Sequence, residues 1–177
     1  MEPKPKLVIL GCYHEIQRAA VVPQYEADQQ FLRSLIPELI EQHNIQFIGE
    51  ETKQGQESIA AEIATRRGIR YVNIDIPLDV QHQIKTRPST IYNEDKRVVE
   101  SIVHSDKYSK AWNLVREYHM YRTFMEQLGC DECSLLVCGR LHVTGFLNLF
   151  GNGFDIVPIC VGPRVEGCCV EDTQTQV

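Results

Sequence analysis

The sequence predicts an α/β protein with a mainly parallel central sheet flanked by helices. Its short, continuous apolar runs lack strict alternation, which is typical of strands buried on both faces of a parallel sheet. Longer segments between these runs carry apolar residues at helical spacing, and this alternation indicates β-α-β units. At 177 residues the chain is long enough for one compact domain with its own core.

The elements follow from these patterns in chain order. The predicted strands are residues 6–10, 45–49, 70–74, 134–138 and 154–160. The predicted helices are residues 24–43, 56–67, 94–128 and 143–150. Pro37 is expected to bend the first helix, and Ser105 marks a possible break that would divide the third into two.

Two further segments and the extent of the domain complete the expected organisation of the chain. Residues 76–93 are polar and rich in turn-forming residues, so we expect a loop or lid there. A single domain is expected over residues 1–165. Residues 166–177 are expected to form a flexible C-terminal tail.

Composition and net charge limit the partners and the cellular compartment that we expect for this protein. The net charge of −6 disfavours a nucleic-acid binder, which would show a basic face. No apolar run approaches the roughly 20 residues of a membrane span, and the first residues do not resemble a signal peptide. The cysteine count of 7 is odd, which favours reduced, buried thiols. We therefore expect a cytoplasmic protein without membrane or nucleic-acid partners; the sequence leaves open whether it is a monomer or a homodimer.

Two predicted strands end in the same short motif. The first runs into Gly11 and then His14, and the fourth runs into Gly139 and then His142, with the same Gly-x-x-His spacing. A glycine at such a place lets the chain turn sharply and lets its backbone approach a ligand closely. Two such units, each at the end of a strand, indicate a common function.

Acidic residues follow the second and third predicted strands. Glu50 and Glu51 come after the second strand and Asp75 after the third. Ligands of open parallel sheets bind outside the carboxyl ends of the strands, where these side chains should meet the two histidines. Two imidazoles and a carboxylate suit a divalent transition metal with open positions for water and substrate. Taken singly, each histidine could have a structural role. The two glutamates could form a solvated strand end, and Asp75 could cap a turn. The convergence of all these residues at one edge favours an active or ligand-binding site.

These motifs resemble those of the TIKI/TraB group and its erythromycin esterase-like and ChaN-like relatives. LGCYHEIQ is similar to the first Gly-x-x-His motif and FIGEET to the glutamate motif. VREYHMYRTF is similar to a helical arginine element, and LLVCGRLHVTGFLNLFGNGFDIV to the closing motif. The resemblance implies a compact α/β core with its site at the strand ends. Members include metal-dependent proteases, esterases and a haem-binding protein, so the resemblance leaves the reaction open.

The resemblance also assigns residues. The matching positions are His14, His142, one of Glu50 or Glu51, Arg116 and Glu117. Met120 would pack beneath the helical pair. The chain is much shorter than the larger members and lacks room for the inserted helices that build their clefts, so we do not expect it to cleave large substrates.

The first hypothesis is a hydrolase that acts on an amide or ester bond of a small molecule or peptide. His14, His142 and Glu51 would bind Mn, Co or Zn, which activates water and polarises a carbonyl. The catalytic set would be Glu50, Glu51, Arg116 and Glu117, with one glutamate as general base and Arg116 stabilising negative charge. Gly11, Tyr13, Asp75 and Gly139 would line the pocket. A metal-free version would use one histidine as the base.

Two alternatives remain at this stage. The same pocket could bind a small ligand or haem without turnover, and Cys12, Tyr13 and the histidines are all residue types that ligate iron. The chain could also be a structural partner in a complex, which would leave the cluster at the strand ends unexplained.

Overall fold

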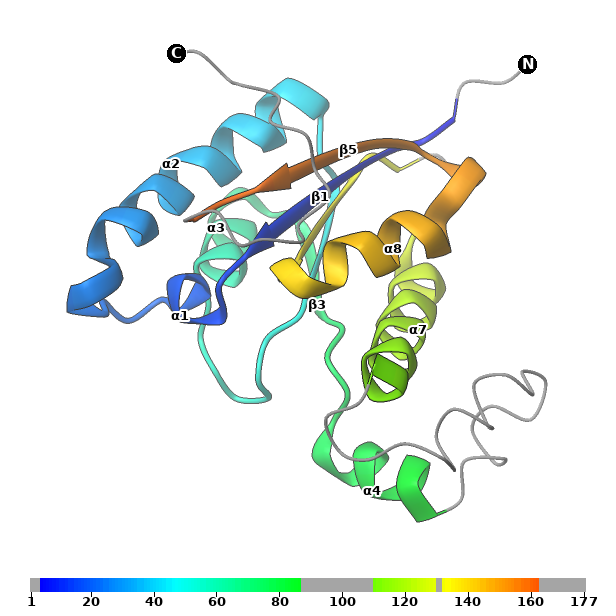
Figure 1. Cartoon of the computed structure of the whole chain (residues 1–177). Helices are drawn as coiled ribbons and strands as arrows, with labels where there is room; N and C mark the ends of the chain where they lie inside the picture. The colour runs from blue at the N-terminus through cyan, green and yellow to red at the C-terminus, as the bar shows by residue number, and fades with distance from the viewer. Residues whose placement is uncertain (1–3, 87–109, 130–131, 163–177) are drawn as a thin grey trace.

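The computed structural model describes residues 4–86, 110–129 and 132–162 (Figure 1). In them, five parallel strands form one sheet, which confirms the predicted α/β class. The strands are β1 (Lys6–Cys12), β2 (Phe47–Glu50), β3 (Arg70–Asn73), β4 (Ser134–Gly139) and β5 (Asp155–Cys160). Their order across the sheet is β3-β2-β4-β1-β5, so β1 and β4 are neighbours although they lie far apart in the sequence.

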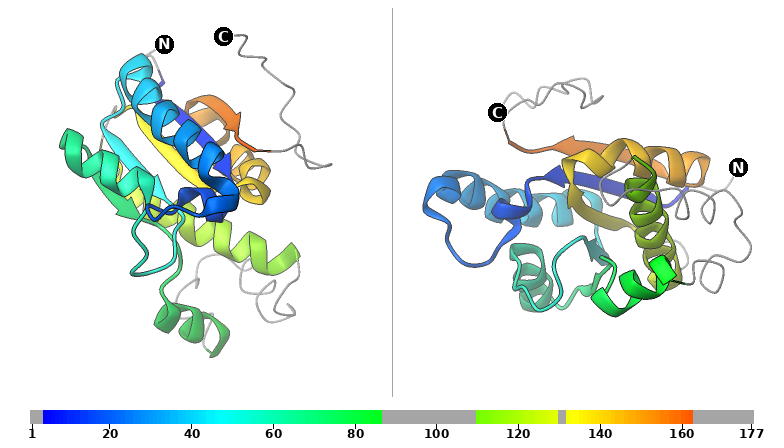
Figure 2. Two further views of the ribbon diagram at one scale, coloured as in Figure 1. Left: turned by 90° about the vertical axis from the view of Figure 1, so that its left-hand side faces the viewer. Right: turned by 60° about the horizontal axis from the view of Figure 1, so that its bottom comes forward.

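Helices cover both faces of the sheet. They are α1 (His14–Gln17), α2 (Glu26–His43), α3 (Ile59–Arg67), α4 (Leu78–Thr86), α7 (Lys110–Gln127) and α8 (Val143–Phe150). Short 3₁₀ turns occupy Pro23–Tyr25, Arg140–His142 and Gly151–Gly153. Helices α2 and α3 pack on one face, and α7 and α8 on the other (Figure 2).

The handedness of parallel crossovers explains this division. The chain moves from β1 to β2 and then to β3 toward one edge, and afterwards returns through β4 to β5 toward the other. Because such crossovers are right-handed, the two directions of travel place their helices on opposite faces. The sheet is thus buried on both sides, which accounts for its continuous apolar strands.

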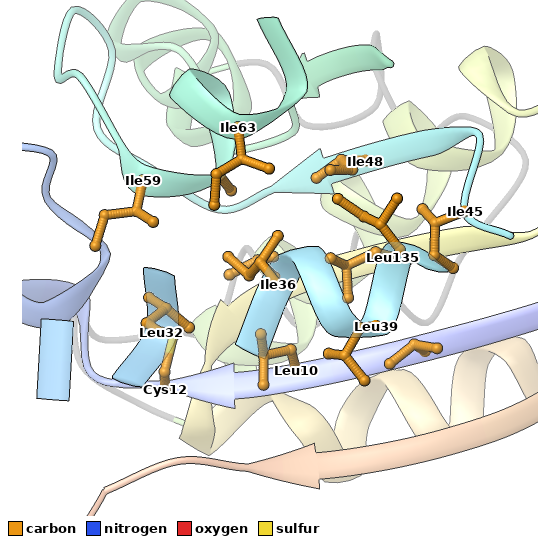
Figure 3. Packing of buried hydrophobic residues seen from close by; sticks show 14 of the residues in the cluster. Leu10, Cys12, Leu32, Ile36, Leu39, Ile45, Ile48, Ile59, Ile63 and Leu135 are labelled. Carbon is orange, nitrogen blue, oxygen red and sulfur yellow. The ribbon is translucent and has the colours of Figure 1, made fainter. Parts of the chain in front are cut away.

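Alternation along each strand divides the core in two. In β2, Phe47 packs with Phe124 of α7, and Ile48 packs with the cluster of α2 and α3. Figure 3 shows the second of these clusters, in which Ile36 and Leu39 of α2 lie against the sheet. The same alternation continues through Glu50, the last residue of β2, and Glu51, so these two side chains point to opposite faces of the sheet.

The structure corrects one expected element. Residues 78–86 form helix α4, so the prediction of a loop over residues 76–93 is wrong for this part. The helix forms because Ile84 is fully buried beside Ile76 and Val115 of α7. Most residues in this part of the sequence are polar, so its few apolar positions did not indicate a helix.

Other expectations fall partly outside the described residues. These are the remainder of the expected loop or lid, the first half of the helix expected at 94–128, and the tail at 166–177. Helix α2 continues through Pro37 as one element of 18 residues. Within the described residues, no helix combines the length and apolar character that crossing a membrane requires.

Candidate functional site

The two Gly-x-x-His units lie side by side at the carboxyl edge of the sheet. Strand β1 pairs with β4, and Cys12 is in register with Gly139. After β1 the chain turns to the face of α2, whereas after β4 it turns to the face of α8. Such a divergence of neighbouring strands opens the crevice in which α/β proteins bind ligands. His14 and His142 follow the two strands at this point.

His142 is buried between two carboxylates. Its Nδ1–H donates to Glu117 Oε1 at 2.9 Å, and its Nε2 lies 3.4 Å from Glu51 Oε1. Burial alone would lower the pKa of His142, but the bonds to Glu117 and Glu51 and the charge of Glu51 outweigh it and raise the pKa to about 9. His142 is therefore an imidazolium at neutral pH, fixed in orientation by Glu117.

Glu51 is the residue on which the other groups converge. Its side chain is 1% exposed, its Oε2 accepts a bond from the Gly139 N–H at 2.8 Å, and its Oε1 accepts one from Arg116 Nη2 at 2.6 Å. Burial alone would raise its pKa, but the bond to His142 and the charges of His142, His14 and Arg116 hold the pKa at about 2. Glu51 is therefore ionised throughout the physiological range.

Arg116 extends the cluster toward β3. The nitrogen that binds Glu51 also donates to Asp75 Oδ1 at 3.0 Å. Arg116 and Glu117 are neighbours on α7, so this one helix supplies both the cation that holds Glu51 and the carboxylate that holds His142. The charged groups form one chain of contacts in the order Asp75, Arg116, Glu51, His142 and Glu117.

His14 is the imidazole that solvent can reach. Its side chain is 49% exposed, and its Nε2 lies 3.7 Å from Glu51 Oε1. Gly139 makes this approach possible, because a Cβ at that position would lie 3.0 Å from His14 Nε2. The glycine of the second motif thus gives room to the histidine of the first.

Glu50 lies apart from this cluster. As the residue before Glu51 in an extended strand end, it points to the opposite face, where its fully buried carboxyl accepts bonds from Ser58 Oγ and from Tyr71 OH. Burial raises its pKa to about 7, although both hydrogen bonds act in the other direction. Sequence reasoning placed both glutamates at one site because it considered only the strand end and neglected the alternation.

The remaining predicted pocket residues occupy varied places. Gly11 lies within β1, where a Cβ would come 2.4 Å from Val143 Cγ2, so this glycine lets α8 begin close to the sheet. Tyr13 is half-buried at the strand end, with the Arg140 guanidinium 5.7 Å from its ring centre. Cys12 is buried, accepts a bond from Gln17 Nε2, and has a pKa raised by burial to about 12. Such a thiol is poorly suited to bind iron.

Gly145 is a site residue that sequence reasoning missed. It lies in α8, and a Cβ there would come 2.0 Å from Glu117 Oε2, so the carboxylate that orients His142 occupies the space a side chain would fill. A glycine inside an otherwise apolar helix was the available signal, because glycine weakens a helix unless its position requires it.

We expect Gly145→Ala to destabilise the protein by about 1–3 kcal/mol, because the added methyl group displaces Glu117. In the interior of most helices, replacing glycine with alanine stabilises the protein instead. The pKa of His142, measured by NMR titration, should fall in the variant. Thr144→Ala on the exposed side of the same helix is the control. A stabilised Gly145→Ala protein with an unchanged His142 pKa would contradict the assignment.

His14, His142 and Glu51 are the side chains expected to hold a divalent metal. Within the described ranges no three His, Cys, Asp or Glu side chains form a ready metal-binding group. The relevant atoms are nonetheless close, since His14 Nε2 and His142 Nε2 lie 3.7 and 3.4 Å from Glu51 Oε1. Two ligands of one ion, each about 2.1 Å from it, lie roughly 3–3.5 Å apart. The His142–Glu51 separation lies in this range, and the His14–Glu51 separation is slightly longer. Binding of such an ion here would also require a neutral His142 and the displacement of Arg116 from Glu51.

Comparisons of the chain with protein-family models, with curated proteins and with solved structures found no match. The resemblance to the TIKI/TraB group thus rests on the motifs quoted above.

Proposed function

We propose that the protein is a hydrolase acting on an ester or amide bond, with its active site at the carboxyl ends of β1, β2 and β4. The observation that carries this proposal is the pairing of an accessible histidine with a buried, ordered charge cluster. His14 is 49% exposed and lies beside Glu51, which is 1% exposed and ionised. Buried ionisable groups with strongly shifted pKa values that converge beside an accessible base are characteristic of active sites.

In the proposed reaction His14 acts as the general base. It takes a proton from water while the oxygen of that water forms a bond to the carbonyl carbon, and negative charge develops on the carbonyl oxygen. Arg116 would stabilise this charge, and its contacts with Glu51 and Asp75 fix its position before the reaction begins. His14 then returns the proton to the leaving oxygen or nitrogen as its bond to carbon breaks.

A divalent ion such as Mn, Co or Zn would be held by His14, His142 and Glu51. When bound, such an ion supplies a Lewis acid that polarises a carbonyl and lowers the pKa of water. In that case Glu117 would still orient His142 through Nδ1, as second carboxylates do for metal-bound histidines. Of the iron-ligating side chains expected at this pocket, His14 is accessible and Tyr13 is half-buried, whereas His142 is buried and Cys12 is held as a buried thiol.

We expect His14→Ala to reduce hydrolysis by about 10²- to 10⁴-fold while leaving the melting temperature within a few degrees of the wild type. The half-exposed ring contributes little packing, so its loss affects chemistry more than folding. The measurement is hydrolysis of a panel of small esters, amides and short peptides, with Mn²⁺, Co²⁺, Zn²⁺ or a chelator. The control is His43→Ala, because His43 interacts with Lys6 and Asp155 at the amino-terminal edge of the sheet.

Full activity in His14→Ala would show that His14 is not the general base. Tight binding of panel compounds by the wild type without turnover, under every metal condition, would instead favour the non-catalytic ligand-binding alternative. Loss of wild-type activity with the chelator, together with weaker binding of the metal ion by His14→Ala than by the wild type, would identify His14 as a metal ligand rather than a free base.

A further inference from the structure

Glu50 is a fully buried carboxyl that the proposed mechanism does not use. We propose that Glu50 is a positioning residue, which holds the chain segment after His14 in place relative to Glu51 by way of Ser58. This inference rests on the proposed function, since it concerns the geometry of the same site. It replaces the expectation that Glu50 is a general base, a role that would require contact with water or substrate.

The first link joins Glu50 to Ser58. Ser58 Oγ donates to Glu50 Oε2, and the same Oγ accepts the Ala61 N–H at 3.1 Å, which makes Ser58 the N-cap of α3. The loop between β2 and α3 begins with Glu51 and ends at Ser58. The Glu50 side chain therefore fastens the far end of this loop to the strand end from which Glu51 projects.

The second link joins Ser58 to the segment that follows α1. Ser58 forms an antiparallel bridge with Arg18, and the Ala19 N–H donates to the Glu57 carbonyl at 3.1 Å. Arg18 directly follows α1, the four-residue helix that begins with His14. A shift of Ser58 would therefore move the segment to which the short helix of the proposed base, His14, is joined.

Other contacts make this segment rigid enough to transmit a shift. The buried Gln29 side chain donates to the carbonyls of Arg18 at 2.8 Å and Ala20 at 2.9 Å, and its Oε1 accepts the Val22 N–H at 2.8 Å. Arg33 donates to the Ala19 carbonyl at 2.7 Å. The segment is thus held from α2 on one side and from the loop before α3 on the other, and only the second attachment depends on Glu50.

The arrangement around Glu50 also suits an anchor better than a base. Both hydroxyls donate to the same oxygen, Oε2, whereas Oε1 is buried without a hydrogen-bond partner among the described residues. An amide oxygen could accept the same two bonds. The positioning role therefore does not require a charge, and Gln at this position should preserve it whereas Ala should not.

The test compares Glu50→Ala with Glu50→Gln in the full chain and follows the histidine ring signals by NMR. We expect Glu50→Ala to shift the ring signals of His14 and to leave those of His43 unchanged. Glu50→Gln should restore the His14 signals. Leu39→Ala, which removes buried contacts of α2 in the same core, controls for general loss of stability.

These readouts need no turnover, so they separate this inference from the proposed function. If Glu50→Ala leaves the His14 signals unchanged, or if Leu39→Ala shifts them as much, the positioning role is overturned even when the protein is an active hydrolase. If Glu50→Ala does not fold, Ser58→Ala removes the same link and should give the same shift of His14. Where hydrolysis is found, Glu50→Ala should add little to the loss caused by His14→Ala, because the two act as a unit.

Discussion

Replacement of Glu51 by alanine is expected to lower the free energy of unfolding by about 3–5 kcal/mol, because it takes from Arg116 and the buried His142 the carboxylate that they share. Arg116 Nη2 and His142 Nε2 both lie within 3.4 Å of Glu51 Oε1, and His142 is only 6% exposed. Chemical denaturation at pH 7 measures the loss. Hydrolysis should disappear as well, since Glu51 adjoins the proposed base.

The control for this prediction is Glu126→Ala on the surface of α7. Glu126 pairs with Arg122 at 3.2 Å, and both side chains are largely exposed. An exposed pair of this kind contributes only about 0–1 kcal/mol. Equal losses in the two variants would show that Glu51 is not the centre of a buried charge cluster.

The pH dependence of the same cluster has a definite sign. The pKa of His142 is raised from 6.5 to about 9 in the folded protein, so its contribution to stability is complete below pH 6.5 and is lost as pH rises through 9. The pKa of Glu51 is lowered from 4.5 to about 2, so its contribution is complete above pH 4.5 and is lost as pH falls through 2. In Glu51→Ala the decline of stability between pH 6.5 and 9 should become smaller, because His142 retains only Glu117.

Replacement of Glu50 by glutamine is expected to have the opposite effect and to stabilise the protein by roughly 3 kcal/mol above pH 7. Burial raises the pKa of Glu50 from 4.5 to about 7, so the folded state holds a proton that the unfolded state has already released. The stability contribution of this group is therefore complete below pH 4.5 and is lost as pH rises through 7. Glutamine keeps the acceptor oxygen for Ser58 and Tyr71 and never ionises.

The two proteins should thus be equally stable near pH 4 and diverge as the pH rises to 8. Denaturation curves at several pH values measure this difference. Tyr71→Phe, which removes one of the two bonds to Glu50 Oε2, should raise the pKa of Glu50 further, so the divergence should continue to higher pH. A constant difference at all pH values would show that the Glu50 carboxyl is not the titrating group.

The contrast between these two glutamates shows what the sequence could not provide. Their positions next to each other indicate only that both lie at the carboxyl end of the second predicted strand. Alternation places Glu51 on the face of α7, beside Arg116 and His142, and Glu50 on the face of α3, where its hydrogen-bond partners among the described residues are two hydroxyl groups. The same residue type therefore has a pKa of about 2 at one position and about 7 at the next.

By itself the sequence determined the α/β class and the edge of the sheet at which His14, His142, Glu51 and Asp75 gather. Both follow from short-range patterns, because apolar runs define strands and parallel strands share one carboxyl edge. The tertiary structure decided the rest: α4 from its contact with α7, the orientation of His142 by Glu117, and the space that Gly145 leaves for that carboxylate. These features depend on contacts between residues distant in the chain, and the burial that fixes their charges exists only after the layers have packed.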